Sequence, residues 1–147
     1  MSYTCLLYHV VFATKDRRPW LSSEYLPRIQ EYMGGTLRNL KGKLLAAGGV
    51  ADHVHLAMSL NPSVAVADAV RTVKCNSTGW IRDTFPGLTS FAWQDGYAAF
   101  SVSMSALPQV HRYLAGQAAH HAKRSFADEL RALLVKHGIE FDGSRLM

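Results

Sequence analysis

The chain has 147 residues, 48% of them hydrophobic, which suffices to bury a core within one compact domain. It lacks both an apolar run near the roughly 18 residues of a membrane span and a secretory leader pattern. Its two isolated cysteines, Cys5 and Cys75, favour a reducing compartment. These features argue against membrane and secreted classes. We expect a single domain over residues 1–147 and a cytoplasmic location.

The charge balance indicates the kind of partner. There are 16 basic residues against 11 acidic ones, a formal net charge of +5, and residues 32–82 hold six basic and only two acidic side chains. Such an excess favours a polyanion such as nucleic acid. A moderately basic protein without that partner is the alternative.

The first half of the chain predicts a strand, a helix, a strand pair and a second helix. Residues 2–14 are almost continuously apolar or β-branched, as in a strand buried on both faces. Ser22 or Ser23 can cap a helix with Pro27 near its first turn. Residues 44–50 and 53–60 read as the strand pair. The second helix, of about 20 residues, follows the turn at 61–63 and ends at 85–87.

The second half predicts two short strands and two helices. Residues 91–93 and 97–103 are expected strands around a hairpin turn at 94–96. One helix runs from about Ser105 to Lys123, and another from the capping Ser125 to Gly138. The resulting fold class is α+β: a ferredoxin-like split βαβ sandwich, with an antiparallel sheet, helices on one face and two extra C-terminal helices.

Two histidines share one face of the second strand of the pair. His53 and His55 are two residues apart, so their imidazoles point the same way and form half of a divalent-cation site. Histidines facing solvent or a polar core are the alternative. Asp52 is a candidate to orient one imidazole, or is a plain turn residue.

A second polar group lies on the predicted 105–123 helix. Tyr113, Gln117 and His120 fall within one stripe at helical spacing. Gln117 can add an oxygen ligand to the histidine pair, and Tyr113 would then be placed to attack a metal-polarised phosphodiester. His120 is a candidate for phosphate binding or proton transfer. Taken alone, the tyrosine would be ordinary packing, and the other two ordinary surface residues.

Four segments resemble the single-tyrosine HUH transposases of bacterial insertion sequences of the IS two-hundred type, including their REP-associated relatives. In the family's order they are Tyr8–Lys15, Gly49–Leu56, Phe91–Tyr97 with Phe100–Ser103, and Tyr113–His121. The resemblance implies that His53, His55 and Gln117 bind Mg²⁺ or Mn²⁺ and that Tyr113 forms a 5′-phosphotyrosine with single-stranded DNA. It also implies a homodimer, hairpin-bearing DNA as partner, and a bacterial, nucleoid-associated location. Gly116 departs from the family, where asparagine is common.

Basic and aromatic side chains are candidates for contacts with DNA. The phosphate-contact candidates are Lys15, Arg17, Arg18, Arg71 and Lys74. Trp93 and Tyr97 are possible stacking platforms, although a strand tryptophan favours core packing and His9 is expected to be buried. The competing functions are a domesticated relative that processes REP palindromes, a non-catalytic single-strand nucleic-acid binder, and a zinc hydrolase that uses the histidine pair.

Overall fold

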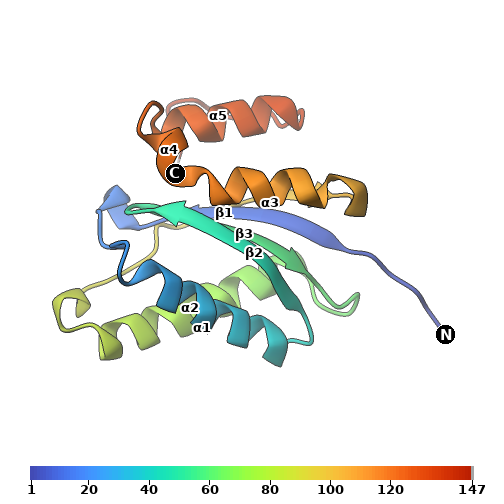
Figure 1. Ribbon diagram of the computed structural model, residues 1–147, viewed down its shortest axis with the longest axis horizontal. Coiled ribbons are helices and arrows are strands. Elements are labelled where there is room, and N and C mark those ends of the chain that lie inside the picture. The colour runs from blue at the N-terminus through green and yellow to red at the C-terminus, as the bar shows by residue number, and fades with distance from the viewer. Residues whose placement is uncertain (147) are drawn as a thin grey trace.

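The computed structural model describes residues 1–146 and contains one four-stranded antiparallel sheet. Its strands lie in the order β2-β3-β1-β4, with bounds β1 (Leu7–Ala13), β2 (Lys43–Val50), β3 (His53–Ser59) and β4 (Ala98–Val102). Helices α1 (Leu26–Asn39) and α2 (Val66–Thr84) cover one face. The C-terminal helices α3 (Leu107–Ala115), α4 (Gln117–His121) and α5 (Phe126–Lys136) lie across the other (Figure 1). This arrangement confirms the predicted α+β, ferredoxin-like class.

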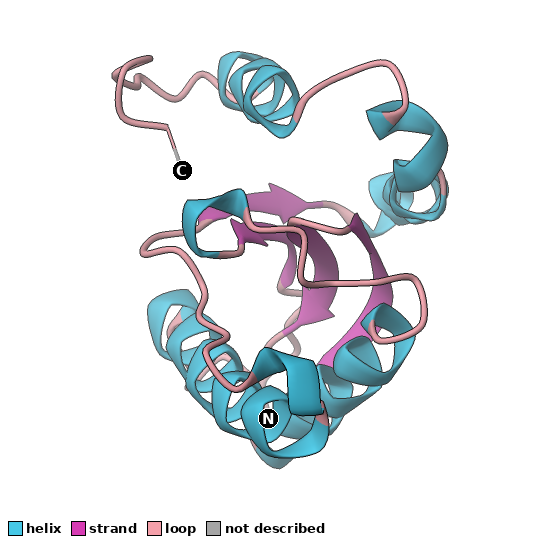
Figure 2. Cartoon of the chain, turned by 90° about the vertical axis from the view of Figure 1, so that its left-hand side faces the viewer, coloured by secondary structure: helices cyan, strands magenta, loops and turns pink. Residues whose placement is uncertain are grey.

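Each face of the sheet has its own apolar core because strand side chains alternate. On β1, Val10 and Phe12 pack with α1 and α2, whereas Val11 and Ala13 pack with Phe126 and Leu130 of α5. The sheet therefore lies between two helical layers (Figure 2). Any polar side chain on the α5 side of β1 or β3 is consequently enclosed.

Several predicted boundaries are confirmed. Pro27 lies at the start of α1, where no intrahelical N–H is required. The Ser125 hydroxyl accepts a hydrogen bond from the Asp128 N–H and caps α5. Gly138, just after the C-cap residue of that helix, has a φ of 67°, the left-handed conformation that glycine tolerates best.

The first strand is shorter than predicted. β1 starts at Leu7 because its neighbours end there: Leu7 pairs with Ser59 of β3 and Val102 of β4. Residues 2–5 have no ladder partner, and the Tyr3 side chain is exposed. An apolar pattern cannot show where the neighbouring strands stop.

The predicted hairpin around residues 94–96 is wrong. Trp93 forms an isolated bridge with Thr14, while Ala98 pairs with Val11 on the same edge of β1. Residues 94–97 lie between these two pairings and belong to no strand, and Gly96 there has a φ of 90°. Residues 91–93 are consequently not a separate strand that could form a hairpin with β4.

The predicted helix 105–123 is divided. A short 3₁₀ helix, η3 (Met104–Ala106), precedes α3, and Gly116 ends α3 with a φ of −91° and a ψ of 9°. Gln117 then begins α4. Glycine costs about 1 kcal/mol relative to alanine inside a helix, so the break falls where helical continuation is weakest.

Two further 3₁₀ helices, η1 (Lys15–Arg17) and η2 (Pro86–Leu88), lie in loops. Within residues 1–146, no helix combines the length and the apolarity that crossing a bilayer requires. Cys5 and Cys75 are exposed free thiols.

Candidate active site

The site is built on the histidine pair of β3. This strand is central, between β2 and β1, and its alternation turns His53 and His55 toward the C-terminal helices. Both side chains are fully buried. The burial excludes the solvent-facing arrangement and leaves two of the predicted ones, a polar core and a metal pair.

A carboxylate from α5 lies at the centre of this cluster. Glu129 is 1% exposed, and its Oε1 lies 3.0 Å from His55 Nε2 and 3.3 Å from His53 Nε2. His121, at the end of α4, places its own Nε2 3.0 Å from the same oxygen. Three imidazoles thus converge on one carboxylate oxygen.

The second oxygen of Glu129 faces the predicted nucleophile. The Tyr113 hydroxyl donates a hydrogen bond to Oε2, and the Gln117 amide donates to it at 3.0 Å. The Gln117 carbonyl oxygen lies 3.3 Å from His53 Nε2. Glu129 therefore connects the phenol to the histidine pair within one chain, and the structure brings together all four residues predicted for metal binding and attack.

The Nδ1 atoms of the three imidazoles are held by surrounding groups. His53 Nδ1 lies 2.7 Å from Asp52 Oδ1, and His121 Nδ1 lies 2.8 Å from the Arg124 carbonyl oxygen. His55 Nδ1 lies 2.8 Å from Nε2 of His9, which is buried as predicted. Each ring is thereby oriented with Nε2 inward, and Asp52 occupies the orienting position foreseen for it.

The electrostatics follow from this packing. Burial opposes charge on Glu129, but hydrogen bonds from His53 and His55 hold its pKa well below the usual range. Burial alone would lower the pKa of His53, yet its contacts with Asp52 and Glu129 raise it. Burial and the neighbouring Glu129 raise the pKa of Tyr113, so the phenol keeps its proton at neutral pH.

The donor set suits a divalent cation. Four side chains each offer one ligand atom, and these atoms all lie within 4.8 Å of one another: His53, His55, His121 and Glu129. Imidazole nitrogens and a carboxylate oxygen are common ligands of first-row transition metals. Within residues 1–146, the histidine pair predicted as ligands thus belongs to a group of four side chains that could hold a metal ion, and the sequence did not indicate His121 and Glu129 as members of it.

The burial of His120 Nε2 and of Glu129 was not expected from the sequence. His120 Nε2 is a buried atom without a hydrogen-bond partner and lies 3.4 Å from Glu129 Oε2, so the side chain borders the site. Glu129 was missed because a single glutamate in a helix is ordinarily solvated. The available signal was its place between Phe126 and Leu133 on the apolar stripe of α5.

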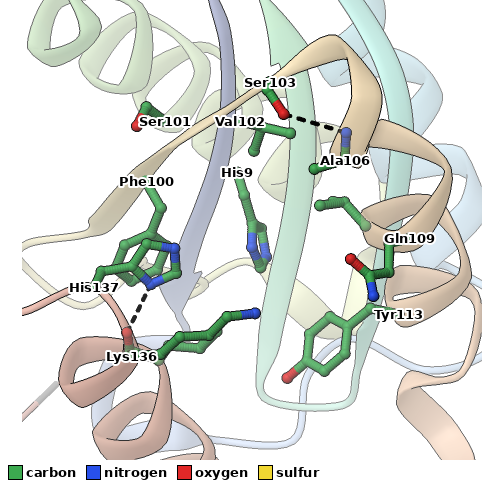
Figure 3. Close-up of a pocket in the computed structure, with 12 residues that line it drawn as sticks. His9, Phe100, Ser101, Val102, Ser103, Ala106, Gln109, Tyr113, Lys136 and His137 are labelled. Carbon is green, nitrogen blue, oxygen red and sulfur yellow. Dashed lines mark hydrogen bonds between the residues drawn. The ribbon is translucent and has the colours of Figure 1, made fainter.

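Two cavities flank the cluster. One, of about 480 Å³, is lined by Tyr113, His9, Gln109 and Lys136, and Figure 3 shows the Lys136 side chain extending toward Tyr113, with His9 above both. The other, of about 600 Å³, is lined by Arg17, Asp52, His121 and Arg124. Both provide room beside the site, and each carries basic side chains.

The predicted DNA contacts lie in different places. Lys15, Arg17 and Arg18 are exposed around η1, and Arg17 borders the second cavity. Arg71 is exposed on α2, on the opposite face of the sheet, and pairs with Asp68 at 2.6 Å.

The other candidates are internal to the fold. The Lys74 ammonium donates to the carbonyl oxygens of Gln94 and Gly96 at 2.7 and 2.9 Å, which favours a structural role. Trp93 is buried against Phe12 and Phe91, so it is a core residue and cannot stack on bases.

Comparison with known proteins finds transposases both by family and by sequence identity. The family model described as "Transposase IS200 like" matches residues 2–117. The ISDra2 transposase TnpA of Deinococcus radiodurans is 24% identical over 117 residues, which cover 76% of this chain and 84% of that protein. The family match includes His53, His55, Tyr113 and Gln117 but ends before His121 and Glu129.

Two solved structures share the architecture. A protein of Deinococcus radiodurans R1 whose description proposes a transposase has a TM-score of 0.66 and 25% identity, over 79% of this chain and 93% of that one. A REP-associated tyrosine transposase bound to a REP hairpin has a TM-score of 0.62, over 82% and 72% of the two chains. At 14% identity, the second likeness concerns the fold alone.

Proposed function

This chain belongs to the IS200-like transposase family, and from that premise we propose that it nicks and rejoins single-stranded DNA at hairpin-flanked ends through a 5′-phosphotyrosine on Tyr113. One observation carries the proposal: the Tyr113 phenol and the His53–His55 pair contact the same buried carboxylate. A pure binding module would need neither the phenol nor the histidines in this arrangement.

The chemistry is a phosphoryl transfer. The Tyr113 oxygen attacks the scissile phosphorus, a tyrosine O–P bond forms, and the P–O3′ bond breaks. The 3′ oxygen leaves with the bonding electron pair and takes a proton from water to become a hydroxyl. The phenolic proton passes to Glu129 Oε2, which already accepts it. Because the pKa of Tyr113 is raised and that of Glu129 lowered, this transfer is uphill in the resting site and must accompany O–P bond formation.

His53 and His55, with Gln117 by family resemblance, would hold the Mg²⁺ or Mn²⁺. When bound, this dication polarises the phosphate and offsets the charge that develops at phosphorus. The phosphotyrosine conserves the energy of the broken bond, so a 3′ hydroxyl can attack it and rejoin the strand without ATP.

Two features support the DNA substrate. Lys136 and Arg17 line the cavities on either side of the cluster, where their charges can neutralise phosphates of a single strand. The REP-associated relative binds a hairpin, which favours hairpin-bearing DNA and leaves a palindrome-processing variant of the same function open. We also propose that the protein forms a homodimer. Within each subunit, Tyr113 would attack DNA bound at the histidine pair of its own chain, because both contact Glu129 of that chain.

The test uses a labelled hairpin oligonucleotide with unpaired flanks, incubated with the protein and Mn²⁺ and then resolved on a denaturing gel. The wild type is expected to give a covalent protein–DNA band that Tyr113→Phe abolishes. Tyr3→Phe, which alters an exposed tyrosine outside the site, should retain the band. His53→Ala should lose the band but keep most DNA binding, since phosphate contacts elsewhere supply most of the affinity.

Two other results would contradict the proposal. Cleavage that persists in Tyr113→Phe would indicate a zinc hydrolase that uses the histidine pair and water. Salt-sensitive binding without any covalent band, over a range of hairpins and metals, would indicate a binding module.

A further inference from the structure

The C-terminal segment beyond the family match reaches into the site. His121 and Glu129 lie outside residues 2–117, yet they provide two of the four clustered donors. We propose that His53, His55, His121 and Glu129 form a three-imidazole, one-carboxylate centre that selects a transition-metal dication over Mg²⁺. This inference rests on the proposed function for the location of the cation. It replaces Gln117 as a ligand by His121 and Glu129.

The distances fit a compact metal centre. Neighbouring ligands about 2.0–2.2 Å from a common metal lie roughly 3.0–3.5 Å from one another, and a metal with these four donors can expand to a fifth position for the phosphate. The separations from Glu129 Oε1 to the Nε2 atoms of His53, His55 and His121 are 3.3, 3.0 and 3.0 Å. All four ligand atoms lie within 4.8 Å of one another, so one cation could bind them once the imidazole nitrogens move closer together around it.

The surroundings of the imidazoles also fit metal ligation. Asp52 and the Arg124 carbonyl hold the Nδ1 atoms of His53 and His121, and His9 holds that of His55. Since a carboxylate or carbonyl accepts a proton from Nδ1, a cation that displaces the Nε2 protons would bind the Nε2 lone pairs of His53 and His121. Outer groups that fix the tautomer and the ring orientation are characteristic of metal-binding histidines.

Gln117 receives a different role in this arrangement. Its amide N–H₂ donates to Glu129 Oε2, so it positions the carboxylate whose other oxygen faces the imidazoles. A neutral amide oxygen is a weaker ligand than a carboxylate, and Glu129 is nearly fully buried beside the imidazoles. We assign the ligand position to Glu129 and the positioning role to Gln117.

The donor set determines the preference among metals. Mg²⁺ favours oxygen ligands and retains several waters, whereas three imidazoles suit Mn²⁺, Fe²⁺, Co²⁺ or Zn²⁺. We expect millimolar Mg²⁺ to leave micromolar Mn²⁺ bound.

The test titrates the metal-free, full-length protein with Mn²⁺ by calorimetry and with Co²⁺ by visible absorption, which is more intense for four-coordinate than for six-coordinate cobalt. Glu129→Gln, close to isosteric, should weaken Mn²⁺ binding at least about tenfold, since even the loss of an outer-shell partner costs 10–100-fold. The cobalt bands should weaken as well. Asp128→Asn is the matched control because Asp128 is the exposed neighbour on α5.

His121→Gln provides an independent variant and should also weaken Mn²⁺ binding at least tenfold, with folding of each protein checked by circular dichroism. Wild-type Mn²⁺ affinity in both folded variants would overturn the inference, as would displacement of Mn²⁺ by equimolar Mg²⁺. The two proposals fail separately. Glu129-dependent metal binding without a phosphotyrosine refutes only the proposed function, whereas a phosphotyrosine with Glu129-independent metal binding refutes only this inference.

Discussion

Three histidines turn Nε2 toward one oxygen of Glu129, and a fourth, His9 on β1, holds one of them, His55. His9 has no charge partner in direct contact, since its polar neighbour is the His55 ring. Burial, reinforced by the nearby His55, lowers the pKa of His9 to about 3. The folded protein therefore keeps this imidazole neutral under conditions in which the unfolded chain binds a proton.

This difference predicts a pH dependence of stability. The unfolded His9 is protonated below a pKa of about 6.5, so the stabilisation is intact at pH 7 and is lost as the pH falls below that value. In chelator-treated protein, we expect the free energy of unfolding to fall more steeply for wild type than for His9→Gln, by up to about 1.4 kcal/mol per pH unit. Urea unfolding at pH 7, 6 and 5 measures this, and parallel pH profiles would contradict it.

For individual site residues, the sequence predicted those that lie on the same strand or helix. It missed those that come close only when separate elements pack together. The common face of His53 and His55 follows from strand alternation alone. Glu129 is 76 positions after His53 on a separate helix, so its place in the site depends on how α5 docks on the sheet. His121 was not singled out as a site residue, for the same reason.

Among the structural elements, α3 carries Tyr113 and packs closely on β2. Gly48 permits this approach, because an added Cβ there would lie 2.2 Å from the Leu114 carbonyl oxygen and 2.8 Å from its carbonyl carbon. These are backbone atoms, so a side chain at position 48 must displace the helix. The position of the nucleophile thus depends on a glycine in a neighbouring strand.

Gly48→Ala is expected to shift α3 and reduce strand cleavage at least tenfold, with a loss of about 1–3 kcal/mol in the free energy of unfolding from overpacking. Gly35→Ala is the control, because its Cβ would meet only the flexible end of Arg38 at 3.7 Å, and alanine favours a helix by about 0.5–1 kcal/mol. Cleavage assays and thermal unfolding of both variants provide the measurement. Unchanged cleavage in Gly48→Ala would show that α3 tolerates displacement.

The element order was predictable because apolar periodicity and capping signals are local. The interruption in pairing at residues 94–97 and the break at Gly116 were not predictable, since each depends on contacts made after folding. Trp93 and Ala98 share one edge of β1, and Gln117 is buried near the histidine pair. Pairing of both segments with β1 thus replaced the expected hairpin, and burial of Gln117 accompanies the break in the expected continuous helix.

For the whole molecule, the two helical layers separate the basic side chains into distinct groups. Arg17 lines a cavity beside the histidine cluster, whereas Arg71 lies on α2, on the opposite face of the sheet, and is paired with Asp68. Both were predicted as phosphate contacts from charge alone. Of the two, only Arg17 lies beside the histidine cluster.

We therefore expect Arg17→Gln to weaken DNA binding and to reduce the slope of log affinity against log salt concentration by about 1, as the loss of one phosphate contact should. Arg71→Gln, the same change on the opposite face, should leave the slope unchanged. Fluorescence anisotropy over a salt series distinguishes the two. Equal effects would indicate that DNA contacts both faces of the molecule.

The most direct measurement identifies the residue that becomes linked to DNA. Trypsin cleaves after Arg112 and Lys123, and the peptide between them contains Tyr113 as its single hydroxyl-bearing side chain. Mass spectrometry of the digested protein–DNA adduct should therefore find the nucleotide mass on Tyr113–Lys123. A nucleotide attached to any other peptide, or cleaved DNA without an adduct, would contradict the central claim.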